Sequence, residues 1–158
     1  MPCADRTASN ERGMALALAL FALVIIGGIV GGNFFAGLLE QQSGRSTLFL
    51  AQASEAAEAE LREALLTTPA TTLVQLAGAG ATLDLGPRSP YSGLTVERQV
   101  SRLTNDLFVI RTRGIRQNAE GAALATRTVG LLVQVIADTL TGTDSVVPLS
   151  ERAWVQLY

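Results

Sequence analysis

Hydrophobic and polar positions divide the chain sharply near its N-terminus. From Met14 to Leu39 the sequence carries no formal charge and is almost entirely apolar, behind a polar segment that ends in Glu11, Arg12 and Gly13. At about 1.5 Å per residue, a helix over 14–39 is roughly 39 Å long, enough to cross a hydrocarbon core of about 30 Å. Its large aliphatic and aromatic side chains supply roughly −6 kcal/mol of insertion free energy. The pattern predicts a transmembrane helix.

An alanine- and glutamate-rich stretch, 40–66, follows the apolar run. Its apolar residues recur at steps of three and four, at Ala56, Ala57, Leu61, Ala64 and Leu65, which predicts a helix with one apolar face. Glu58 and Arg62 are spaced for an i,i+4 ion pair on its polar side. Because Pro69 disfavours helix in the residue before it, we expect the helix to end at 66. A single helix over 14–66 would be roughly 80 Å long.

Beyond Pro69 the hydrophobic period changes to two. Short apolar pieces at 73–76 and 81–85 flank Gly78-Ala79-Gly80, which lacks the third glycine of a dinucleotide-binding turn and is interpreted as a loop. Residues 86–90 have turn chemistry. Strands are predicted from Leu94 to Arg102, from Leu107 to Arg113 with a bulge at Gly114, and from Ala123 to Ala137; turns are predicted at 104–106, 118–121 and 141–144, and a further edge strand over 152–158.

The predicted fold is α+β, with one antiparallel sheet packed on the long N-terminal helix. Four segments result: a leader (1–13), a transmembrane helix (14–39), an amphipathic continuation (40–66) and a small β-rich head (67–158). The head is large enough for one small core.

Composition excludes several kinds of chemistry. Among 158 residues there is no histidine, every basic residue is an arginine, and the formal net charge is −2. The chain therefore lacks a histidine-based triad, a Schiff-base lysine and a P-loop lysine, and it has no basic run for nucleic acid. We expect no enzyme activity, no cofactor and no metal site. Asp138 and Asp144 flank a glycine turn, but their spacing lacks the other ligands of a calcium loop, so a plain turn is favoured. The only cysteine, Cys3, lies in the predicted leader.

The apolar run is too long for a cleaved secretory signal, and 34–37 is a poor cleavage site. A lipoprotein signal would need a cysteine after the run, whereas Cys3 precedes it. Cleavage between Gly13 and Met14 would instead keep the helix in the mature chain.

A polar leader that ends in Gly13, followed by a long apolar helix, resembles the class III signal of type IV prepilins and pseudopilins. The resemblance implies that a prepilin peptidase cuts after Gly13 on the cytoplasmic side and methylates Met14. Most major pilins have glutamate at the fifth mature position, where this chain has Leu18; an apolar residue there is a feature of PilX-like minor pilins and of the tip pseudopilin of type II secretion. The stretch 51–65, with Ala-Glu repeats before leucine, also looks like the PilX-like N-terminal region.

This resemblance covers about the first 66 residues and implies a minor pilin-like subunit of a type IV pilus or a type II secretion pseudopilus. It implies an inner-membrane precursor with an extracytoplasmic head, and partners that include other pilins or pseudopilins, the assembly platform, the prepilin peptidase and the lipid bilayer. The absence of glutamate at Leu18 favours a position at the tip or in assembly initiation. Whether the chain serves a pilus or secretion, and what its head binds, stays open.

Two features have both an ordinary structural interpretation and a functional one. Gly27, Gly28, Gly31 and Gly32 allow close helix contact or a hinge that melts on assembly, yet glycine is also common in membrane helices. Arg111, Arg113, Arg116 and Arg127 favour a solvated strand face. Their functional interpretation is contact with acidic helices of neighbouring subunits, at Glu55, Glu58, Glu60 and Glu63.

An alternative belongs to another class of protein. In this interpretation the chain is a bitopic membrane protein whose extracytoplasmic β-domain binds a partner and never polymerises. The N-terminus of the membrane-associated protein distinguishes the two, since the filament interpretation requires the loss of Cys3.

Overall fold

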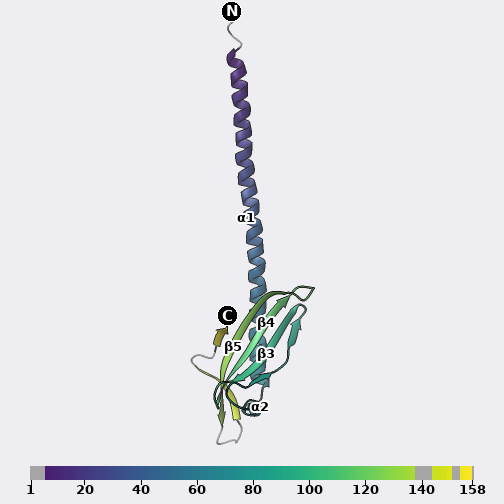
Figure 1. Ribbon diagram of the computed structural model, residues 1–158, viewed down its shortest axis with the longest axis vertical. Helices are drawn as coiled ribbons and strands as arrows, with labels where there is room; N and C mark the ends of the chain where they lie inside the picture. The colour runs from purple at the N-terminus through teal and green to yellow at the C-terminus, as the bar shows by residue number, and fades with distance from the viewer. Residues whose placement is uncertain (1–5, 138–143, 151–153, 158) are drawn as a thin grey trace, which may run out of the picture. The chain divides into compact units, whose positions relative to one another are not determined.

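The computed structural model describes the backbone of residues 6–137, 144–150 and 154–157 (Figure 1). Helix α1 (Arg6–Thr67) contains the whole predicted helix and begins eight residues earlier than Met14, inside the predicted leader. The chain divides into an N-terminal unit that ends at Arg45 and a C-terminal unit that begins at Ser46. The two units are described separately below.

In the N-terminal unit, every side chain described from Met14 onwards is exposed. Even large apolar side chains are exposed there: the exposed fraction is 72% for Phe34 and 71% for Val24. By length and composition, α1 from Met14 is apolar enough to cross a membrane, with a mean hydropathy of 2.7 in its most apolar window. The length and composition of this helix therefore agree with the predicted transmembrane helix.

In the C-terminal unit, α1 ends where the sequence predicts. The amide of Thr68 donates to the carbonyl of Ala64 at 3.0 Å, and the Thr67 hydroxyl donates to the carbonyl of Glu63 at 2.8 Å. These bonds satisfy groups that the last turn would otherwise leave free. Pro69, with φ −71°, then starts the short helix α2 (Ala70–Val74).

The rest of the C-terminal unit is one antiparallel sheet. Its strands are β1 (Thr82–Asp84), β2 (Arg88–Tyr91), β3 (Leu94–Arg102), β4 (Leu107–Gln117), β5 (Ala123–Ala137), β6 (Asp144–Pro148) and β7 (Trp154–Leu157). The order is β1-β3-β4-β5-β6, with β2 also paired to β3 and β7 to β5. Strands β3, β4 and β5 lie side by side in Figure 1 and form the predicted three-strand meander. The predicted final edge strand is also present as β7, whereas β6 was not predicted.

Helix α1 from Ser46 packs on one face of this sheet, so the α+β architecture is observed. The core joins one stripe of α1 and Leu73 of α2 to the inward positions of β3, β4 and β5. Its buried members are Ala57, Leu61, Ala64, Leu73, Val100, Phe108, Ile110, Val129, Leu131 and Val133. A second small cluster consists of Ala56, Leu94 and Val96. Burying both apolar faces against each other is what makes this two-layer arrangement stable.

The predicted bulge at Gly114 is wrong. Gly114 lies on β4 and pairs in regular register with Val96 on β3 and with Arg127 on β5. The irregularity in the pairing of β4 with β5 falls between Arg116 and Gln117 instead. The glycine has a different cause, because a Cβ at this position would lie 2.1 Å from the carbonyl oxygen of Ala53. Only a residue without a side chain lets the helix backbone approach the strand this closely.

The turn predicted over 86–90 is only partly correct. Gly86 has φ +79° and its amide donates to the Asp84 carboxylate at 2.8 Å, which is turn geometry. Arg88 to Tyr91, however, form β2 along the edge of β3. Every residue of β2 is exposed, so it has no alternation of buried and exposed positions that sequence could reveal.

Candidate assembly surfaces

The proposed processing site, the Gly13–Met14 bond, lies within α1 rather than ahead of it. Met14 and Leu18 are exposed, at 66% and 64%. Both side chains are thus available to an enzyme, to lipid or to another subunit.

The glycine cluster occupies four positions within the stretch 27–32 of α1, namely Gly27, Gly28, Gly31 and Gly32. A Cβ added at any of them would meet no atom within 4 Å. Their small size therefore fits nothing inside this chain, in contrast to Gly114. The free space is available to a neighbouring helix, which small residues allow to approach closely in lipid.

The predicted pair between Glu58 and Arg62 forms, with the carboxylate 3.6 Å from the guanidinium. Both side chains are well exposed, so the pair contributes only a few tenths of a kcal/mol. Glu55 is exposed on the same segment and makes no ion pair within the described residues.

Two of the four helix carboxylates assigned to neighbouring subunits are instead engaged inside the C-terminal unit. Glu63 pairs with Arg88 of β2 at 3.3 Å, and Glu60 pairs with Arg98 of β3 at 3.5 Å. The sheet that packs on this helix thus supplies counter-charges to both carboxylates, and only Glu60 is buried by its pair. Of the four, Glu55 alone has no ion pair within the described residues, and Glu58 has only its exposed pair with Arg62.

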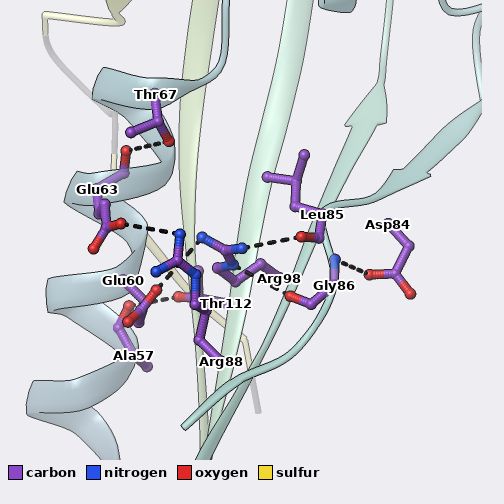
Figure 2. Close-up of polar contacts among 10 residues, drawn as sticks. All are labelled: Ala57, Glu60, Glu63, Thr67, Asp84, Leu85, Gly86, Arg88, Arg98 and Thr112. Carbon is purple, nitrogen blue, oxygen red and sulfur yellow. Dashed lines mark hydrogen bonds and ion pairs between the residues drawn. The ribbon is translucent and has the colours of Figure 1, made fainter. Parts of the chain in front are cut away.

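The pair of Glu60 and Arg98 is buried, with each side chain only 9% exposed (Figure 2). Arg98 also donates to the carbonyls of Leu85 at 3.0 Å and Gly86 at 3.3 Å. One guanidinium thus joins α1 to the segment between β1 and β2. The Thr112 hydroxyl adds a second buried link, a bond of 2.7 Å to the Ala57 carbonyl.

The arginines of the sheet are partly a solvated face, as expected. Arg113 and Glu97 form an exposed pair at 3.4 Å, and Arg111 is exposed without an ion pair among the described residues. Arg116 is half-buried and donates to the Ser92 carbonyl at 2.8 Å, and Arg127 is half-buried on β5. Of these four arginines, Arg111 and Arg113 are the exposed ones, and Arg113 is paired with Glu97.

Arg102, to which no role was assigned from sequence, holds the turn between β3 and β4. It donates to the carbonyls of Thr104 at 3.1 Å, Asn105 at 2.9 Å, Val74 at 3.2 Å and Leu76, and its guanidinium lies 5.6 Å from the centre of the Phe108 ring. The available signal was its inward position in the alternating run, because an inward arginine needs partners.

A groove of about 480 Å³ lies in the C-terminal unit between α1 and the hairpin of β2 and β3. Its lining includes the apolar residues Ala56, Ala59 and Leu94, together with Glu55 and the 75%-exposed Tyr91.

Within the described ranges no three histidine, cysteine, aspartate or glutamate side chains are grouped to hold an ion. Asp144 begins β6, whereas Asp138 and most of the predicted turn at 141–144 fall outside the described residues.

Comparison with models of known protein families, with curated proteins and with solved structures gave no match.

Proposed function

We propose that this protein is a minor pilin-like structural subunit of a type IV pilus or a type II secretion pseudopilus. The observation that carries the proposal is α1, whose apolar N-terminal half has no part of the described chain packed on it and whose C-terminal half packs on a β-sheet. A helix of this kind can lie in lipid in the precursor and against sister helices in a filament. Because lipid and neighbouring helices are similarly apolar, the exchange costs little hydrophobic free energy.

The proposed precursor is a single-pass protein of the inner membrane with an extracytoplasmic head. A prepilin peptidase removes residues 1–13 and methylates Met14, and the assembly platform then delivers the subunit to other pilins or pseudopilins. Leu18 in place of the usual glutamate supports a position at the tip or in assembly initiation.

Substitution of Gly13 tests the processing step. We expect Gly13→Leu to abolish maturation, because a peptidase that recognises the small residue before the scissile bond has no room for a branched side chain. N-terminal sequencing of the membrane-associated protein should give Met14 for the unaltered chain and a retained Cys3 for the variant. A Gly13→Ala variant serves as the matched control and should still be processed, at least in part. Equal processing of the leucine variant would argue strongly against a class III signal.

The glycine cluster gives a second test, on assembly. Replacing Gly27, Gly28, Gly31 and Gly32 by leucine should lower incorporation into filaments about tenfold, because bulky side chains keep neighbouring helices apart. The matched set of alanines should be tolerated, since small-xxx-small spacing is kept and no clash arises within the chain. Immunoblots of sheared filaments against membrane fractions measure the ratio. Loss of incorporation with alanine would instead indicate a hinge, and full incorporation with leucine would mean that the glycines have no role in assembly.

One observation favours a second candidate function. The groove with Tyr91 and Glu55 in its lining could hold a partner, as a bitopic membrane protein that never polymerises would require. Such a protein would keep Cys3 and would be absent from filaments.

A further inference from the structure

Asn33 is the only polar side chain in the apolar run from Met14 to Leu39. It is exposed on α1 and makes no hydrogen bond with any residue that the structure describes. If the run is centred in the bilayer, Asn33 lies about 10 Å from the midplane, inside a half-thickness of about 15 Å. Its amide is too short to reach the lipid headgroups. This inference rests on the proposed function, because it requires the run to lie in a membrane.

An amide in hydrocarbon is unfavourable unless both its donor and its acceptor are satisfied. The side chain of asparagine carries an NH₂ group and a carbonyl oxygen, so an identical amide on a second helix can satisfy it reciprocally. A second copy of the same chain is therefore a partner of matching chemistry.

The residues around Asn33 give such a partner a surface. Steps of four and three residues place them along one side of α1, here named the Asn33 face: Ala15, Ala19, Ala22, Ile26, Ile29, Asn33, Ala36 and Glu40. This heptad spacing is that of a left-handed helix pair, in which one buried asparagine fixes the register. Its four alanines allow close approach of the backbones in lipid.

The Asn33 face is separate from the glycine cluster. At 100° per residue, Gly27, Gly28, Gly31 and Gly32 are centred roughly 170° around the helix from Asn33. Because the described side chains of both sides are exposed, contact on one leaves the other open to a different helix.

We propose that two copies of this chain pair in parallel within the membrane through the Asn33 face, joined by reciprocal hydrogen bonds between their Asn33 amides. Pairing of this kind precedes assembly and leaves the glycine clusters free on the outside of the pair.

Cysteine cross-linking of the full-length chain in membrane vesicles tests the pairing. With Cys3 changed to serine, Ile26→Cys places a thiol on the Asn33 face and Val24→Cys places one on the opposite side at similar depth. Oxidation with copper phenanthroline should give a disulfide-linked dimer with Ile26→Cys and at least fivefold less with Val24→Cys. Equal cross-linking at both positions, or none at either, would overturn the proposal.

The role of the amide is tested in the Ile26→Cys background. Asn33→Leu should lower the dimerisation constant about 3- to 30-fold, the range expected for a hydrogen bond between membrane helices. Asn33→Gln keeps both donor and acceptor and should retain most of the pairing. Unchanged pairing with leucine, or equal loss with both variants, would contradict a hydrogen bond between the two amides.

The vesicles contain no assembly machinery, so the pairing result and the filament result can fail separately. A chain that pairs through Asn33 but never enters filaments would disprove the filament role alone. A chain that enters filaments but shows no dependence of pairing on Asn33 would disprove this inference alone.

Discussion

Replacing Gly114 with alanine is expected to destabilise the C-terminal unit by about 3–5 kcal/mol, above the roughly 1–3 kcal/mol typical of overpacking substitutions. The added Cβ would lie 2.1 Å from the Ala53 carbonyl oxygen and 3.0 Å from its carbonyl carbon. Both atoms belong to the helix backbone, so no side-chain rotation can relieve the overlap. The helix must move away from β4, which also stretches the buried bond from Thr112 to Ala57.

Thermal unfolding of the full-length chain in detergent micelles measures this effect. The fluorescence of Trp154, the single tryptophan, reports on the sheet, whereas the helical signal of the N-terminal unit would hide it in far-ultraviolet circular dichroism. We expect a fall in Tm of roughly 15 °C. Gly44→Ala is the matched control: its Cβ meets no atom, and it should not destabilise the chain. A Gly114→Ala variant with unaltered Tm would show that the helix does not approach the strand so closely.

Replacing Arg98 with alanine should cost about 3–5 kcal/mol of unfolding free energy, because it leaves Glu60 buried without a counter-charge. The two carbonyls that the guanidinium holds, those of Leu85 and Gly86, also lose their donor. The distance of 3.5 Å between Arg98 and Glu60 is longer than a good charge-assisted hydrogen bond, and one buried oxygen of Glu60 has no hydrogen-bond partner. The ion pair itself is therefore a weak net stabiliser, although losing one partner is costly.

A double variant separates these two effects. Glu60→Leu combined with Arg98→Met removes both charges while keeping apolar volume, and we expect it to recover most of the lost stability. Urea unfolding of the wild type, both single variants and the double variant, followed by Trp154 fluorescence, completes the cycle. Arg113→Ala breaks an exposed pair with Glu97 and should change stability by less than about 1 kcal/mol. An Arg98→Ala cost as small as that of Arg113→Ala would contradict the buried pair.

The long helix and the central meander could be predicted because their periods are strong. The three- and four-residue steps from Ala56 to Leu65 correspond to the buried stripe of α1, and Pro69 marks its end. Alternation also located β3, and the Val-, Thr- and Leu-rich run from Ala123 to Ala137 matches β5 at both ends.

What could not be predicted depends on contacts between distant segments. The local sequence around Gly114 is typical of a β-bulge. The reason for a glycine there is the close approach of the Ala53 backbone, which is far away in the sequence. Glu60 looks like any glutamate on a polar helix face until Arg98 is placed opposite it. Strand β2 is fully exposed and is defined only by its pairing with β3.

The candidate assembly surfaces divide in the same way. The apolar run, Gly13 and the glycine cluster are predictions from local composition. Of these, the structure bears on the apolar run, which forms a helix long and apolar enough to cross a membrane. The structure adds that an added Cβ at any of the four glycines would meet nothing within the chain. It also shows that Glu58, Glu60 and Glu63 each have an ion pair inside the chain, whereas Glu55 has none within the described residues.

Mass spectrometry of purified filaments decides whether this chain is a filament subunit. Filaments are sheared from cells that carry the intact gene, freed of membrane, and digested so that the N-terminal peptide is recovered. We expect this chain to be present, with an N-terminal peptide that begins at a methylated Met14. Filaments that lack the chain, while an uncut precursor with Cys3 remains in the membrane, would refute the proposal.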